Sequence, residues 1–269
     1  MQTACAAYGS SSANQEARNR EYWQVRLQDW ARDPLTQKNL LEVGFAVLPG
    51  ALLPLEVEAL LQELPYLVEG GAVRMEQQSK GNGGYDYLRQ LPLHLSTLRE
   101  VAYEVFLPSA NEFLQQHCLE VAGCGRSICN ELDVRERRGG LPESLQEFES
   151  LCERRGQTRE SNLLLWYQEG GENRAHRDIY GEVSYPLQML LLLSQPGQDF
   201  NGGRFFTIVD GRKQEANLNC GDLLIFRTSC KHGCTLVRRG RKPEVRRVVV
   251  GLQFAKRQLR RERLARESR

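Results

Sequence analysis

Glycine and proline turns divide the second half of this chain of 269 residues into short, mostly apolar segments. Seven of these segments have the length and composition of strands: Asn162–Gln168, Pro186–Ser194, Gly203–Val209, Gln214–Leu218, Asp222–Arg227, Cys234–Arg238 and Val245–Phe254. Many short strands at this spacing favour a β-sandwich or barrel over βαβ units. The second half is therefore expected to form a β-rich core over residues 162–254.

The first half has helical rather than strand periodicity. Helices are predicted over Glu21–Leu41, 54–64, Leu98–Cys118 with an interruption at Pro108, and Pro142–Arg155. A short buried strand is predicted at residues 43–50, closed by a Pro-Gly turn. Helices followed by strands predict an α+β fold, in which the helices buttress one sheet. We expect a single domain over 21–254, a disordered segment at 1–20 and a basic helical tail at 255–269.

Composition restricts the class of protein more than it names a function. With 41% hydrophobic and 26% charged residues and a net charge of +2, the chain resembles an ordinary globular protein. The longest uninterrupted apolar run, near Met189–Leu193, is too short to span a bilayer. The first 20 residues lack the apolar core of a secretory signal, and no CxxC pair occurs among the eight cysteines. We expect a cytoplasmic protein without a membrane partner.

Two of the four histidines occur in positions that indicate a metal site. His176 and Asp178 follow a predicted strand after a Gly-Gly loop, and in extended chain residues i and i+2 project to one side. His232 follows 54 positions after Asp178, between two predicted strands. Two imidazoles and one carboxylate form the 2-His-1-carboxylate triad, which leaves coordination positions open on iron(II). His94 and His117, in the helical half, are interpreted as structural.

Two other interpretations of these residues remain open. An HxD pair alone is a weak signal, and it also fits a solvent-facing histidine beside an acidic loop residue. Cys230 and Cys234 flank His232, so a zinc site is an alternative, although no second closely spaced cysteine pair is present.

A pair of arginines on the last predicted strand fits the co-substrate that such an iron site would use. 2-Oxoglutarate chelates iron through one end and leaves a buried carboxylate at the other, which needs a cation. Arg246 and Arg247 are candidates that face opposite ways, so one of them is expected to be solvated. Tyr167 can donate a hydroxyl into the same pocket, or it is simply a core aromatic residue.

Residues 163–254 resemble the double-stranded β-helix (jelly-roll, cupin-like) core of the 2-oxoglutarate/iron(II) dioxygenases. The matching segments are Tyr167, His176 with Asp178, Asn201–Phe205, Gly221–Phe226, His232-Gly233 and Arg247. Within that superfamily the chain is similar to a largely uncharacterised, mostly bacterial family labelled a nucleic-acid oxygenase. That likeness is carried by Gly84–Tyr87, Gly156–Arg159, His176–Glu182, Pro186–Gln188 and Leu193–Gly197.

The resemblance implies a cofactor set and a reaction. Iron(II) would be held by His176, Asp178 and His232, and 2-oxoglutarate by Arg247, with Tyr167 and Arg246 as further candidates. O₂ and 2-oxoglutarate would give succinate, CO₂ and a hydroxylated substrate. Hydroxylation of an N-methyl group would remove it. Residues expected on loops at the mouth of the site, and therefore near substrate, are Tyr85, Tyr87, Asn173, Arg174 and Tyr180.

Two departures from the family pattern affect the co-substrate assignment. The loop between His232 and Arg247 is longer than usual and carries several basic residues, so the last strand fits two registers, one with Arg247 and one with Arg246 facing the barrel. Many relatives have Ser or Thr two residues after the arginine, where this chain has Val249. The segment Cys124–Gly140 has no counterpart in the pattern.

Three functions fit the sequence. The first is an oxygenase that hydroxylates a small-molecule or amino-acid-like substrate. The second is an oxygenase acting on alkylated nucleic acid, which the tail supports with seven basic and two acidic residues. The third is a non-catalytic jelly-roll binding module, which has no need for a metal triad.

Overall fold

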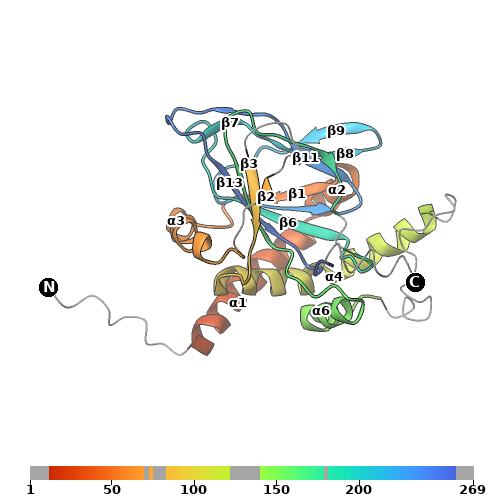
Figure 1. Cartoon of the computed structure of the whole chain (residues 1–269). Helices are drawn as coiled ribbons and strands as arrows, with labels where there is room; N and C mark the ends of the chain where they lie inside the picture. The colour runs from red at the N-terminus through yellow and green to blue at the C-terminus, as the bar shows by residue number, and fades with distance from the viewer. Residues whose placement is uncertain (1–11, 70–72, 75–82, 122–139, 179–180, 259–269) are drawn as a thin grey trace.

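Two antiparallel sheets form the centre of the molecule, and most of the helices lie together on one side of them (Figure 1). The computed structural model describes residues 12–69, 73–74, 83–121, 140–178 and 181–258. The larger sheet has the order β1 (Phe45–Leu48), β10 (Leu223–Arg227), β6 (Leu187–Leu192), β13 (Arg247–Leu252), β4 (Leu163–Tyr167), β3 (Gly83–Tyr87) and β2 (Val73–Arg74). The smaller sheet has the order β5 (Asn173–His176), β11 (Lys231–Cys234), β8 (Phe205–Val209) and β9 (Arg212–Glu215). A two-stranded ribbon pairs β12 (Val237–Arg239) with β7 (Phe200–Gly202).

Alternating residues of these strands face one another between the two sheets. On β6, Leu190 and Leu192 belong to an interior cluster that also contains Phe205 of β8, Phe226 of β10 and Val249 of β13. Because side chains alternate along a strand, the neighbouring positions of the larger sheet point the other way, towards the helices. Two antiparallel sheets closed over an apolar interior, with helices on one outer face, form the expected double-stranded β-helix of an α+β protein.

The helices cover the outer face of the larger sheet. They are α1 (Ser12–Arg32), α2 (Pro34–Glu42), α3 (Pro54–Glu63), the 3-10 turn η1 (Leu64–Tyr66), α4 (Leu93–Val121) and α6 (Leu145–Arg154). Trp23, Leu27, Leu98 and Phe106 from α1 and α4 are buried in one cluster with Leu191 and other outward-facing residues of the sheet. None of the helices in the described residues is long and apolar enough to cross a membrane.

The N-terminal helix begins earlier than the sequence predicted. Disorder was expected through residue 20, but α1 starts at Ser12. The prediction was wrong for residues 12–20 because a local composition argument does not include contacts with α4. Arg20 binds the carboxylate of Glu104 at 2.5 Å and lies 3.7 Å from Glu100, and both partners are on α4. The helix then continues into the buried tryptophans of its second half.

Two prolines have different effects on the helices. The helix predicted over Glu21–Leu41 is divided at Pro34, where Asp33 caps the second helix by accepting a hydrogen bond from Thr36 N at 3.0 Å. Pro108 was expected to interrupt the later helix, but α4 runs through it. Buried residues on both sides, Phe106 and Ala110, hold that helix against the core despite the missing hydrogen bond.

The first part of the expected basic tail is not helical. Residues 255–258 form an extended segment, in which Arg257 makes a β-bridge with Arg159. Lys256 Nζ lies 2.8 Å from Glu153 and 3.3 Å from Glu160, and Arg257 lies 2.9 Å from Glu69. These two cations are therefore paired within the molecule. The prediction of a helix was wrong for residues 255–258, because it considered local helix propensity and not these tertiary contacts. Residues 259–269, and nearly all of Cys124–Gly140, lie outside the described residues.

Candidate metal centre

The antiparallel pairing of β5 with β11 brings the two candidate histidines together. His176 is the last residue of β5, and its partner across the ladder is His232. Directly opposed residues of an antiparallel pair have their Cβ atoms about 4.5–5.5 Å apart, and the two imidazole centroids are 4.5 Å apart. His232 was expected between two strands, but it lies within β11, which pairs with β5 on one side and β8 on the other.

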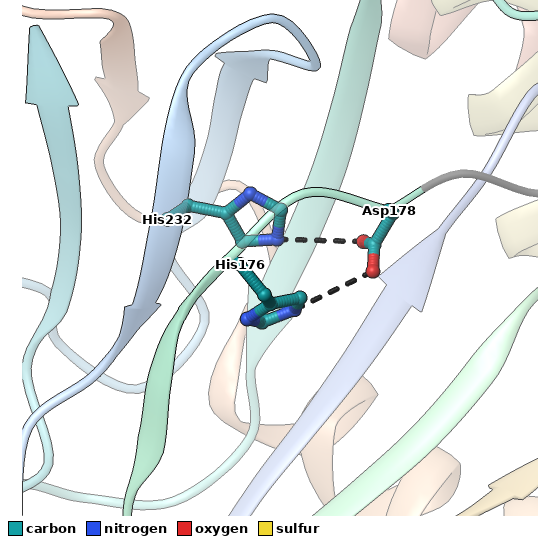
Figure 2. Close-up of side chains that lie close together, drawn as sticks. All are labelled: His176, Asp178 and His232. Carbon is teal, nitrogen blue, oxygen red and sulfur yellow. Dashed lines mark ion pairs between the residues drawn. The ribbon is translucent and has the colours of Figure 1, made fainter. Parts of the chain in front are cut away.

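Asp178 completes a compact group with the two rings (Figure 2). Its Oδ1 is 3.4 Å from His176 Nε2, and its Oδ2 is 3.4 Å from His232 Nε2. All three ligand atoms lie within 4.8 Å of one another. Such a separation lets a single ion between them reach each donor at an ordinary metal–ligand distance of roughly 2 Å.

Hydrogen bonds to the main chain orient both imidazoles. His176 Nδ1 is 2.7 Å from Arg174 O, and His232 Nδ1 is 3.4 Å from Cys230 O. Because a carbonyl only accepts, these contacts favour the proton on Nδ1 and leave the Nε2 lone pair directed at Asp178. Metal-binding histidines use this arrangement, in which the second ring nitrogen donates to a carbonyl or carboxylate.

Gly233 lets the two strands approach closely enough for this pairing. A Cβ at this position would collide with the carbonyl oxygen of Asn173 on β5 and would lie 2.7 Å from the ring of Phe206. The register also shifts between His232 and Cys234, so the ladder is irregular immediately after the ligand. Any side chain at position 233 would therefore separate β11 from β5 and move His232.

Apolar rings surround the buried side of the site. His232 is 5% exposed, and its ring lies 4.7 Å from that of Phe226 and 6.0 Å from that of Phe205. One side of the three-residue cluster therefore faces the apolar barrel interior. The other side is nearer to solvent, and there His176 and Asp178 are partly exposed. An apolar wall strengthens the electrostatic interactions at the site because it lowers the local dielectric constant.

Two of the three groups, Asp178 and His176, have shifted pKa values. Burial raises the pKa of the Asp178 carboxyl, but hydrogen bonds and charge from His176 and His232 lower it by more than burial raises it. The pKa of Asp178 therefore ends well below its usual range. Burial lowers the pKa of His176, whereas the hydrogen bond and charge of Asp178 raise it, and it ends above the ordinary value of histidine.

The donor set fits a divalent transition metal of the iron(II) type. Two imidazole nitrogens and one carboxylate on the same side of an ion leave its other positions open. Within the parts of the chain that the structure describes, no cysteine joins this group. Cys234 Sγ contacts Thr235 O, and Cys230 Sγ lies beside Gly44, so the zinc alternative has no support from the geometry.

Arg247 and Arg246 are on opposite sides of the larger sheet. Arg247 is 3% exposed, faces the barrel interior, and is paired in register with Tyr167 of β4. Its guanidinium lies 5.1 Å from the Tyr167 ring and 5.9 Å from the Phe200 ring. Its Nε has no hydrogen-bond partner, and no carboxylate of the described residues forms an ion pair with it. A buried guanidinium without a carboxylate among the described residues is a costly arrangement unless an anion joins it.

Arg246 is exposed and belongs to a different surface. It lines a groove of about 640 Å³ on the outer face of the larger sheet, together with Asp86, Trp166 and Glu244. The groove does not include the three candidate ligands. The two neighbouring residues therefore differ in position: Arg247 lies inside the barrel, and Arg246 lies outside it.

The other candidate residues are dispersed. Tyr85 and Tyr87 were expected on loops but lie on β3, where pairing with β4 places them on the interior side of the larger sheet. Tyr85 packs edge-on against Tyr87, and the Arg257 guanidinium lies 3.6 Å from the Tyr87 ring centroid. Asn173 is on β5 beside Tyr167, Arg174 is exposed and 3.7 Å from Glu172, and Tyr180 lies outside the described residues.

Sequence reasoning missed two glutamines beside the centre. Gln188 and Gln253 are both buried, and Gln253 Nε2 donates to Gln188 Oε1 at 3.1 Å. With Asp178 they line a cavity of about 20 Å³, which is enough for one water molecule. The available signal was strand alternation, because Gln188 shares a face of β6 with Leu190 and Leu192. A glutamine on such a face indicates a polar region of the barrel.

Comparison with known proteins decides the family. Residues 83–259 match a family described as an oxygenase catalysing oxidative methylation of damaged DNA. The chain belongs to this family. The nucleic-acid oxygenase family expected from the sequence is therefore confirmed, and an oxygenase is an oxidoreductase. Two histidines and one carboxylate are a donor set that suits iron(II).

Individual relatives are more distant or cover less of the chain. An uncharacterised protein of Mycobacterium tuberculosis is 39% identical over 72 residues, which is 27% of this chain and 31% of that protein. Prolyl-4-hydroxylase from Pseudomonas putida is 15% identical, with a TM-score of 0.45 over 83% of this chain and 98% of that one. A prolyl hydroxylase from Trichoplax adhaerens, in complex with a hypoxia inducible factor peptide, is 12% identical, with a TM-score of 0.48 over 92% and 94% of the two chains.

Protonation of His176 should make metal binding depend on pH. His176 must lose its proton to bind a metal, and Asp178 keeps the pKa of that proton above the ordinary histidine value. Iron(II) affinity should therefore fall by at least about tenfold per pH unit below that pKa, because protons compete with the metal for the imidazole nitrogens. Asp178 stays ionised and adds no slope. Anaerobic iron(II) titrations between about pH 6 and 8 measure this. A constant affinity over that range would contradict the prediction, and His94→Asn, away from the centre, should keep the slope.

Proposed function

We propose that the chain holds one iron(II) through His176, Asp178 and His232 and uses O₂ and 2-oxoglutarate to hydroxylate a C–H bond of its substrate. The observation that carries this proposal is the convergence of two Nε2 atoms and a carboxylate within 4.8 Å. The buried guanidinium of Arg247 in the same barrel, whose Nε has no hydrogen-bond partner among the described residues, supports it independently.

The iron supplies binding and activation of O₂ when it is present, and the chain's residues provide the environment for that chemistry. His176 and His232 are held by carbonyls on Nδ1, so they present Nε2 without reorganisation. Phe205 and Phe226 exclude water from one side of the site. In the overall reaction one oxygen atom enters the substrate C–H bond, the other enters succinate, and 2-oxoglutarate loses CO₂.

Arg247 is proposed to bind the C5 carboxylate of 2-oxoglutarate. Its buried charge has no carboxylate partner among the described residues, and Gly203 leaves room for its side chain, because a Cβ there would lie 2.8 Å from Arg247 Cδ. Burial raises the pKa of Tyr167 well above its ordinary value, more than Arg247 and Asn173 lower it, so its hydroxyl stays protonated and can donate. Tyr167 can thus supply the hydroxyl that Val249 lacks.

Two substrate classes fit the proposed reaction. The sequence alone favoured a small-molecule or amino-acid-like substrate over alkylated nucleic acid. The description of the family names damaged DNA, which favours the second. We therefore propose an alkylated base as the substrate to test first. Hydroxylation of an N-methyl carbon would give an N–CH₂OH group, which releases formaldehyde and restores N–H.

Loss of any one of the three ligands should abolish turnover. His176→Ala, Asp178→Ala and His232→Ala each remove a third of the protein ligands of the metal. We expect one iron(II) per chain in the unaltered protein, and no succinate formation above background in the three variants. Metal analysis after anaerobic reconstitution, followed by succinate detection on exposure to O₂, measures both. Full activity of His232→Ala would contradict the assignment.

The two neighbouring arginines provide a matched pair. Loss of one partner of a buried charge pair costs about 3–5 kcal/mol, which is on the order of a hundred- to a few-thousand-fold in affinity. Arg247→Met should raise the 2-oxoglutarate requirement by that order while iron binding is retained. Arg246→Met should do little, because an exposed charge contributes about a kcal/mol or less.

Titration of 2-oxoglutarate with succinate as the readout measures the difference between these variants. Thermal unfolding adds a second measurement, because 2-oxoglutarate should stabilise the parent protein and Arg246→Met but not Arg247→Met. A large loss in Arg246→Met alone would mean that the register is shifted by one residue. Equal behaviour of both variants would contradict the assignment of either arginine.

A truncation tests nucleic-acid binding, and the structure decides where it must begin. Ala255 O accepts from Ser161, Lys256 O from Gln157, and Arg257 is ion-paired, so removal of residues 255–258 would damage the fold. Residues 259–269 contain five arginines and two glutamates. If they contact phosphates, their removal should weaken DNA binding and reduce its salt dependence, because fewer counterions are released. An unchanged salt slope on methylated oligonucleotides would show that the tail does not contribute.

A further inference from the structure

Asp178 lies outside the strand ladder that holds the two histidines. β5 ends at His176, and its pairing with His232 fixes that residue. Asp178 follows two residues later, so its position depends on how the chain is held on either side. On the N-terminal side, the exposed Arg177 donates from Nε to Ser229 O at 2.7 Å. On the C-terminal side a fully buried side chain holds the chain.

That side chain is Gln157, which is 0% exposed. Its Nε2 donates to Val183 O at 3.0 Å and to Lys256 O at 2.6 Å, and its Oε1 accepts from Val183 N at 2.7 Å. A primary amide has two N–H donors, and Gln157 uses both. Because burial of an amide is unfavourable unless its hydrogen bonds are made, this geometry holds Val183 by both of its main-chain groups.

The end of α6 directs Gln157 into the core. Gly156, two residues after the helix, has a φ of +83°, and the N–H of Gln157 donates to Cys152 O at 2.9 Å. A glycine in the left-handed region reverses the chain at the end of a helix. Leu145, Phe148 and Leu151 bury the inner face of the helix, so the residue after the glycine emerges beside the core.

Gly181 lies against the same amide. A Cβ at Gly181 would collide with Gln157 Cδ and would lie 2.5 Å from its Oε1. Along the chain, Gly181 is three residues after Asp178, and Val183 is five residues after Asp178. Asp178 and Val183 also line one cavity of about 20 Å³, so the held main chain is adjacent to the carboxylate.

We propose that Gln157 is a positioning residue of the metal centre, which fixes Asp178 relative to the two histidines by holding Val183. The inference rests on the proposed function, since Asp178 is itself a proposed ligand. Gln157 contacts neither metal nor substrate and acts only through the chain after Asp178. Through Lys256 O, the same amide also joins the C-terminal segment to the centre.

Gln157→Met keeps the length of the side chain and removes all three hydrogen bonds. Loss of a group that orients a metal ligand typically reduces metal affinity by about 10- to 100-fold, and this is the expected rise in the iron(II) dissociation constant. The KM for 2-oxoglutarate should change by less than about threefold, because Arg247 and Tyr167 are untouched. Amide hydrogen exchange at Val183 should accelerate in the metal-free protein.

Asn111→Leu is the matched control. Asn111 Oδ1 accepts from Leu141 N at 2.8 Å, so this variant also removes a side-chain amide that binds the main chain, but one without contact to the proposed ligands. Its iron(II) affinity should equal that of the parent protein whatever its thermal stability. An equal loss of affinity in Asn111→Leu and Gln157→Met would reduce the role of Gln157 to general stability and overturn the proposal.

Gly181→Ala provides a second route if Gln157→Met fails to fold. The added methyl group should displace the Gln157 amide and weaken iron(II) binding in the same way. Gly181→Ala combined with Gln157→Ala removes the collision but not the loss of the hydrogen bonds. The double variant should therefore regain thermal stability while its iron(II) affinity stays low. Recovery of parent affinity in the double variant would overturn the proposal.

The outcomes separate this inference from the proposed function. Parent-like iron(II) affinity in Gln157→Met, together with loss of binding in His232→Ala, would overturn the role of Gln157 alone. Absence of iron(II) binding at the triad in the parent protein would overturn both. Weakened binding in Gln157→Met, with the KM for 2-oxoglutarate retained, supports the proposal.

Discussion

The pairing of β5 with β11 is the interaction on which the candidate metal centre depends. It sets His232 directly opposite His176, and no sequence-local feature could do this, because the two strands are more than 50 residues apart. β11 also pairs with β8, so the ladder that carries His232 is fixed from both sides. Gly233 permits the close approach. Both histidines are thus carried by hydrogen-bonded strands, which hold side chains more firmly than loops do.

In the described part of the chain, the barrel interior combines apolar walls with the buried guanidinium of Arg247. Leu190, Phe226 and Val249 exclude water, and this lowers the dielectric constant around the centre. The same environment makes Arg247 costly without an anion, because the surrounding rings of Tyr167 and Phe200 compensate only part of its lost hydration. Such a site favours a carboxylate ligand, because binding of the carboxylate removes the free-energy cost of burying the arginine charge without an anion.

The helical half and the β half meet at the metal centre rather than only at the core. Gln157, at the end of α6, binds the chain that follows Asp178 and also Lys256 O of the C-terminal segment. Arg99 of α4 donates to Gln253 O and Phe254 O in that segment. The chain that follows β13 is therefore held in place by the helices, beside the centre.

The sequence by itself determined the fold class and the three candidate ligands, because strand alternation and the His-x-Asp spacing are local properties of an extended chain. Only the tertiary structure decided which arginine enters the barrel, since Arg246 and Arg247 differ by one step of register, and pairing with Tyr167 sets that register. Tyr85 and Tyr87 became strand residues through β4, about 80 positions away. Gln157 lies in a segment that carries the family likeness, but its structural role has no local signal, because its hydrogen bonds form only after α6, Val183 and the C-terminal segment have come together.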